Sequence, residues 1–205
     1  LYVLHIANPE VYEHIVGMLA KNKDVLGGKA SHADPREIAE FISGVSFSNS
    51  SRPLIDIAVG CVRNSISALS MHDIGEFITY LGIADRWASR YVLSQLMPDI
   101  ERLISSSFHS SSLDDIAILF SGIGKIDRDE GRRLLEKFGD CIDSIFSQGL
   151  EKYDIDDITS FLLLIAQLDI GFVEGLLTMY GEKLEKMFGD PFRNVVDLIS
   201  RIKEA

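Results

Sequence analysis

The chain has 205 residues, of which 46% are apolar and 25% are charged, so it can bury a substantial core. It contains 20 Lys and Arg residues and 31 Asp and Glu residues, which gives a formal net charge of −11. Because phosphate backbones and anionic lipids require basic surface, this balance argues against a nucleic-acid partner and against a membrane partner.

The location of the protein is predicted from three further features. No secretory signal is visible, and the longest apolar run, residues 161–166, is too short to cross a bilayer. Cys61 and Cys141 have apolar neighbours and form no CxxC pair, which predicts buried free thiols. Together these features favour a cytoplasmic protein. The chain begins with Leu1 inside an apolar stretch, so we expect a segment of a longer array.

The predicted elements are two-helix repeats. In chain order they are a half repeat over 1–31, repeats over about 34–70, 71–110, 112–152 and 154–189, and a half repeat over 190–205. Each full repeat contains an Ile preceded by an acid and followed by apolar residues at helical spacing, which predicts a first helix. The four anchoring residues are Ile38, Ile74, Ile116 and Ile158.

A second helix is predicted in each repeat from a short polar residue eleven positions after the anchor. These residues, expected to form the N-cap or the preceding turn, are Asn49, Asp85, Asp127 and Asp169. A helix breaker recurs within each second helix, at Gly60, Pro98, Gly139 and Gly181. The breakers predict a kinked or split helix, and the alternative is close packing against a neighbouring helix.

The two ends match half repeats. Asn8 and Pro9 begin a helix of the second kind, and Asp190 and Pro191 begin a helix of the first kind. The sequence therefore predicts an all-α fold, a right-handed α-α superhelix (solenoid) of about four repeats with a half repeat at each end. The whole of residues 1–205 is expected to form one array, whose open apolar ends could self-associate.

The repeat resembles known helical families. The period and the capped two-helix unit resemble HEAT-type solenoids, and residues 85–90, an Asp turn followed by Trp87 and Arg90, resemble the HEAT pattern most. The resemblance covers nearly the whole chain and implies a binding scaffold. The repeats also resemble, more distantly, the helical sensor arrays of STAND-type signalling NTPases.

The sequence contains no convincing motif for catalysis or for binding a cofactor or metal. Residues 122–125 lack the Gly and the Ser or Thr of a phosphate loop, and the acidic runs at 127–131 and 154–157 lack calcium-loop spacing. The histidines show no ligand spacing. We therefore expect no catalytic residue, cofactor or metal, and the acidic runs are interpreted as helix starts.

Four residues remain as candidates for binding a partner. Trp87 is interpreted as a buried anchor, with an exposed binding hot spot as the alternative. Arg128, Arg132 and Arg133 form the most basic segment, but acids alternate with them, which favours a solvated face of mixed charge. The predicted function is a non-catalytic scaffold that binds another protein or another domain of its parent chain. The net charge favours a partner with a basic or mixed patch, and the alternative function is a regulatory or sensor region of a larger signalling NTPase.

Overall fold

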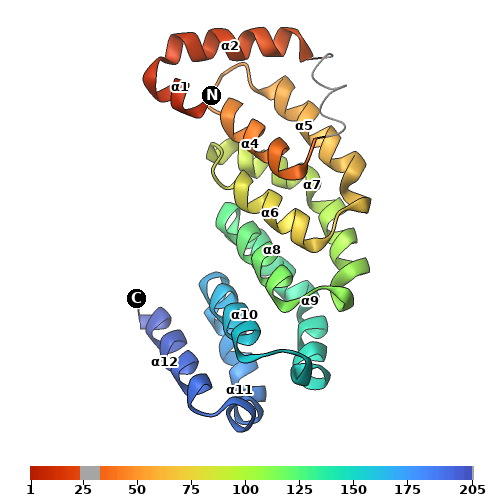
Figure 1. Cartoon of the computed structure of the whole chain (residues 1–205), viewed down its shortest axis with the longest axis vertical. Coiled ribbons are helices and arrows are strands. Elements are labelled where there is room, and N and C mark those ends of the chain that lie inside the picture. The colour runs from red at the N-terminus through yellow and green to blue at the C-terminus, as the bar shows by residue number, and fades with distance from the viewer. Residues whose placement is uncertain (24–32, 205) are drawn as a thin grey trace. The chain divides into compact units, whose positions relative to one another are not determined.

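The computed structural model describes residues 1–23 and 33–204. The described residues form α-helices, short 3₁₀-helices, turns and bends, with no strand among them (Figure 1). This confirms the all-α prediction. Residues 24–31 of the predicted first half repeat lie outside the described residues. No helix in the described part of the chain is long and apolar enough to cross a membrane.

The chain divides into two compact units, Leu1–Ser107 and Phe108–Ala205. The first contains α1 (Tyr2–Ala7), α2 (Pro9–Lys21), α4 (Pro35–Val45), α5 (Arg52–Ser65), α6 (Met71–Leu81) and α7 (Arg86–Ser107). The second contains α8 (Leu113–Ile126), α9 (Arg128–Gln148), α10 (Ile155–Leu168), α11 (Ile170–Phe188) and α12 (Asp190–Glu204). Each predicted full repeat thus contains two α-helices. That the array continues from one unit to the next stays a prediction.

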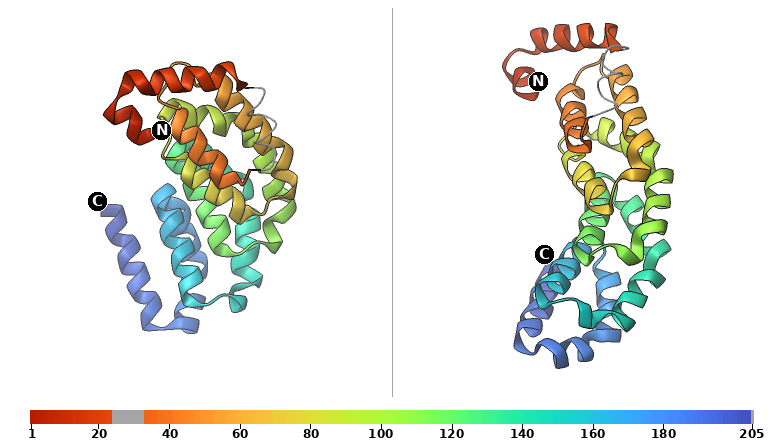
Figure 2. Two further views of the ribbon diagram at one scale, coloured as in Figure 1. Left: turned by 45° about the horizontal axis from the view of Figure 1, so that its top comes forward. Right: turned by 45° about the vertical axis from the view of Figure 1, so that its right-hand side comes forward.

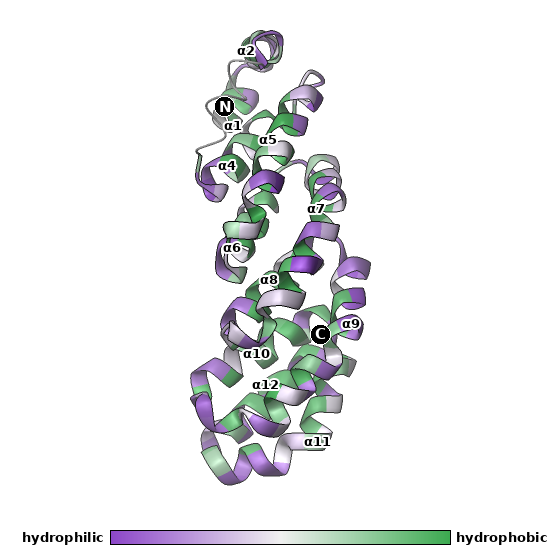
Figure 3. Ribbon diagram, turned by 90° about the vertical axis from the view of Figure 1, so that its right-hand side faces the viewer, coloured by the Kyte–Doolittle hydropathy of each residue, from purple (hydrophilic) through white to green (hydrophobic). Residues whose placement is uncertain are grey.

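The packing within each unit follows the order of the helices. In the first unit α4 packs on α6 and α5 packs on α7, in addition to contacts within each pair (Figures 1 and 2). In the second unit α8 packs on α10, α10 on α12 and α9 on α11. First helices therefore stack on first helices, and second helices on second helices. Hydrophobic and hydrophilic residues share each of these helices, because one side faces the core (Figure 3).

The anchoring isoleucines are buried as predicted. Ile38 is 4% exposed, and Ile74, Ile116 and Ile158 are 0% exposed. Each belongs to the first helix of its pair, where it sits on the side that contacts neighbouring helices. Their burial confirms the helical phase that the sequence indicated for these four helices.

The predicted starts of the second helices are confirmed. Asp127 accepts from the Asp129 amide at 3.2 Å, Asp169 from the Phe172 amide at 3.1 Å, and Asp85 from the Trp87 amide at 2.9 Å. These bonds satisfy amides that have no partner within the helix. Asn49 lies in the turn before α5, as the prediction allowed, and the N-cap of this helix is Ser51.

The chain start differs from the predicted single helix. Two helices, α1 and α2, occupy residues 2–21. Asn8 separates them because its side chain accepts from the Val11 amide at 3.2 Å and so caps α2. Pro9, which has no amide hydrogen, then takes the first position of α2.

The breakers do not split the second helices. Helices α5, α7, α9 and α11 continue through Gly60, Pro98, Gly139 and Gly181, so they are not split at these residues, and a kink there stays a prediction. Packing of a helix against its neighbour stabilises such positions despite their low propensity. Nothing lies within 4 Å of a Cβ built on Gly60 or Gly181, so close packing does not explain these two glycines either.

Candidate functional site

The four candidate residues fall in different units. Trp87 lies on α7 in the first unit, whereas Arg128, Arg132 and Arg133 lie on α9 in the second.

Trp87 is exposed, and its interpretation as a buried anchor is wrong. Its side chain is 48% accessible. The buried stripe of α7 passes through Ala88, Val92 and Leu96, while Trp87 lies on the opposite stripe with Tyr91, one turn further on. Trp87 is exposed because the helical phase of α7 turns it away from these buried residues.

Trp87 belongs to an aromatic–arginine cluster, which we define as Arg52, Asp56, Trp87 and Tyr91. The Trp87 and Tyr91 rings stack with their centroids 5.5 Å apart and their planes at 2°. The Arg52 guanidinium lies 3.7 Å from the centroid of Tyr91 and 5.4 Å from that of Trp87. Helix α5 thus supplies a cation to two stacked rings of α7, of which Trp87 is exposed and Tyr91 is partly exposed.

Asp56 holds the cluster together. It accepts from the Tyr91 hydroxyl at 2.7 Å and from Arg52 Nε at 3.2 Å through the same oxygen, Oδ1. The hydrogen bond to Asp56, with burial and the charge of Asp56, raises the pKa of Tyr91. The hydroxyl therefore keeps the proton that it donates. These bonds fix the Tyr91 ring, on which the Trp87 ring stacks.

The sequence missed Arg52, Asp56 and Tyr91. Two signals were present: Tyr91 follows Trp87 by four residues, and Asp56 follows Arg52 by four, so each pair shares one side of its helix. Bringing the two pairs together required the packing of α5 on α7.

The three arginines of α9 are engaged in contacts within the second unit. Arg128 Nε lies 3.4 Å from the Leu168 carbonyl, Arg132 Nε lies 3.1 Å from Asp169 Oδ2, and Arg133 Nη2 lies 2.8 Å from Glu130 Oε2. Arg128 and Arg132 reach the end of α10 and the turn after it, while Arg133 pairs along its own helix. These contacts support the interpretation of α9 as a face of mixed charge.

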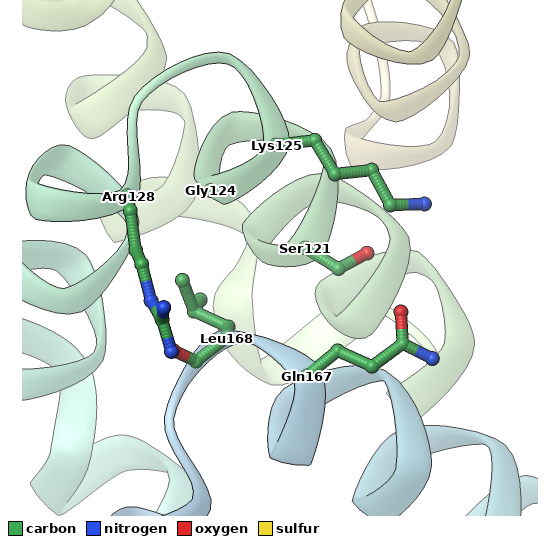
Figure 4. Close-up of a pocket in the computed structure, with 6 residues that line it drawn as sticks. All are labelled: Ser121, Gly124, Lys125, Arg128, Gln167 and Leu168. Atoms are coloured by element: carbon green, nitrogen blue, oxygen red, sulfur yellow. The ribbon is translucent and has the colours of Figure 1, made fainter. Parts of the chain in front are cut away.

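Arg128 also lines a small pocket between α8, α9 and the end of α10. Its other lining residues are Ser121, Gly124, Lys125, Gln167 and Leu168 (Figure 4). Gly122 and Gly124 lie within the last turns of α8, so their amides serve the helix and cannot cradle a phosphate. Residues 122–125 therefore belong to the end of a helix.

Other candidates for chemistry are not brought together. No group of three or more His, Cys, Asp or Glu side chains that could hold a metal ion occurs among the described residues. Cys61 and Cys141 are free, as predicted, but both are partly exposed, so the prediction of buried thiols is wrong. Burial still raises the pKa of the Cys61 thiol.

The chain was compared with known proteins. No protein-family model, no curated protein and no solved structure matches it.

Proposed function

We propose that the chain is a non-catalytic protein-interaction scaffold, built as a right-handed α-α superhelix of two-helix repeats. The stacking of first helices on first helices and of second helices on second helices within each unit supports this architecture. Such arrays provide long surfaces on which another chain can lie.

The observation that carries the proposal is the aromatic–arginine cluster. Tryptophan, tyrosine and arginine are the residues most enriched at the energetic centres of protein interfaces. Trp87, Tyr91 and Arg52 occur together here, with Trp87 48% exposed and its orientation set by its neighbours. Covering a large aromatic ring that is exposed to water lowers the free energy of the system. The cluster is therefore suited to the centre of an interface.

Site-directed photo-crosslinking tests this proposal. A photoreactive phenylalanine analogue replaces Trp87 in the protein, and in a matched control it replaces Gln148, which is exposed at the end of α9. After irradiation in an extract of the expressing cells, we expect position 87 to capture a defined protein that position 148 does not. Excess wild-type protein should suppress the capture, and excess Trp87→Ala protein should not. The same proteins captured at both positions, or none at position 87, would contradict the proposal.

A further inference from the structure

Helices α5 and α7 differ in charge from the rest of the protein. Between them they contain five arginines and three acids, although the whole chain has a net charge of −11. Of the helices that the structure describes, only these two contain more Lys and Arg than Asp and Glu. The five residues, all exposed, are Arg52, Arg63, Arg86, Arg90 and Arg102.

The acids of these two helices offset this charge only in part. Asp56 is engaged with Arg52 and Tyr91 in the aromatic–arginine cluster. Asp99, whose side chain is 15% exposed, lies 3.3 Å from Arg63 Nε and 3.0 Å from Arg102 Nη1. Glu101 is only partly exposed. Arg63 and Arg102, whose side chains are 46% and 76% exposed, therefore reach further into water than Asp99.

We propose that this α5–α7 surface, the five arginines with Trp87 and Tyr91, binds an extended acidic segment of a partner protein. The inference rests on the proposed scaffold function and adds the chemical class of the partner. Guanidinium groups bind carboxylates through paired hydrogen bonds, and the stacked rings supply apolar area beside them. The net charge of the chain favours a basic partner, but the charge at this surface favours an acidic one.

The dimensions of the surface set the length of the segment. Arg52 and Arg63 are eleven residues apart on α5, which corresponds to about 16 Å along the helix. An extended chain covers this distance with about five residues. A short acidic stretch can therefore reach both the aromatic–arginine cluster and the pair of arginines at Asp99.

A nucleic acid also offers negative charge and rings that stack, but the protein disfavours it. A polyanion that continues beyond α5 and α7 meets helices in which acids equal or outnumber Lys and Arg. Repulsion acts over about 10 Å at moderate salt, so the neighbouring helices oppose a long phosphate backbone. A short peptide can stay within the basic surface.

Fluorescence anisotropy of the whole chain tests the inference with three labelled probes at low salt. These are an oligoglutamate peptide of about ten residues, enough to span the surface, an oligolysine peptide and an oligothymidine of about the same length. We expect the glutamate peptide to bind and its affinity to fall as salt is added. The lysine peptide should not bind in the same way.

Paired variants locate the binding. Arg86→Glu combined with Arg102→Glu should lower the affinity for the glutamate peptide by at least about tenfold. The control pair, Lys186→Glu with Arg201→Glu, changes the net charge equally on exposed helices of the second unit and should change affinity by less than about twofold. Trp87→Ala should weaken binding, whereas Met179→Ala, at a residue 61% exposed on α11, should not. Thermal melts verify that each variant is folded.

Three results would overturn the inference: no binding of the glutamate peptide by the folded wild type, equal binding by both double variants, or tighter binding of oligothymidine that the Arg86→Glu, Arg102→Glu pair abolishes. A specific crosslink from position 87 without glutamate binding would leave the scaffold proposal standing and reject only the acidic partner.

Discussion

Gly131 lies where α9 passes close to α8. A Cβ built on this residue would lie 2.8 Å from the Gly124 Cα and 2.8 Å from Leu168 Cδ1. The first of these atoms belongs to the backbone and cannot move aside without shifting a helix. The approach of the two helices therefore depends on the missing side chain.

Gly131→Ala should destabilise the protein. Overpacking costs about 1–3 kcal/mol, which exceeds the gain of about 1 kcal/mol from helix propensity. Gly181→Ala is the matched control, because nothing lies within 4 Å of the new methyl group. It should stabilise α11 by about 0.5–1 kcal/mol. Urea denaturation measures the change in unfolding free energy of each variant, and we expect the two changes to have opposite signs. A stabilising Gly131→Ala would refute the close contact.

Ile116 tests the burial of the anchors. It is 0% exposed, so Ile116→Ala should lower the unfolding free energy by about 2–5 kcal/mol through lost burial and a residual cavity. Met179→Ala removes a side chain that is 61% exposed and should change stability little. A thermal melt unchanged by Ile116→Ala would show that the helical phase of α8 is wrong.

Asp114 makes the stability of the folded protein depend on pH. Its Oδ1 is buried without a hydrogen-bond partner among the described residues, and burial followed by the charges of Asp157, Asp115 and Asp154 raises its pKa. The folded state therefore holds this proton more tightly than the unfolded state, whose ordinary pKa is 3.8. As pH rises from that value through the folded pKa, the wild type loses stability.

Asp114→Asn should remove this loss. Its stability relative to the wild type should therefore improve between about pH 4 and neutral pH. Asp115 keeps a negative charge in the first turn of α8, so the interaction with the helix dipole is largely retained. Urea denaturation at the two pH values measures the difference, and a constant difference between variant and wild type would contradict the assignment.

At the scale of the element, Asp169 connects three helices. It caps α11 through the Phe172 amide, it follows α10, and it lies 3.1 Å from Arg132 of α9. Asp169→Ala should cost about 0.5–2 kcal/mol, as expected for loss of an N-cap. Arg132→Ala removes only a half-exposed ion pair and should cost less than about 1 kcal/mol.

Equilibrium urea denaturation of both variants, with the double variant, separates the cap from the ion pair. If Arg132→Ala costs as much as Asp169→Ala, the ion pair contributes more than the cap. If Arg132→Ala costs less than Asp169→Ala, as expected, the cap contributes more than the ion pair.

At the scale of the whole molecule, the last two helices predict self-association. Leu198 of α12 is 44% exposed and Met187 of α11 is 38% exposed, while Val196 and Ile202 are partly exposed. Sedimentation equilibrium over a concentration series should detect association that Leu198→Glu weakens. Ser200→Glu, on an exposed residue of the same helix, is the control. A monomer at every concentration, or association that Leu198→Glu leaves unchanged, would contradict this prediction.

The sequence by itself determined the helices and much of their spacing. The periodic apolar residues around Ile38, Ile74, Ile116 and Ile158 indicated which side of each first helix is buried. Asp127 and Asp169 marked the starts of second helices. These features follow from interactions between residues within about four positions, which a linear sequence displays directly.

Only the tertiary structure decided which side chains meet. The arginines grouped by sequence on α9 contact three different partners, whereas Arg52 and Tyr91, 39 positions apart, form a cation–π contact. The packing of α5 on α7 makes that contact, and it also sets a basic surface within an acidic chain. Net charge and local spacing cannot reveal such a surface, because they do not specify which exposed helix faces become neighbours.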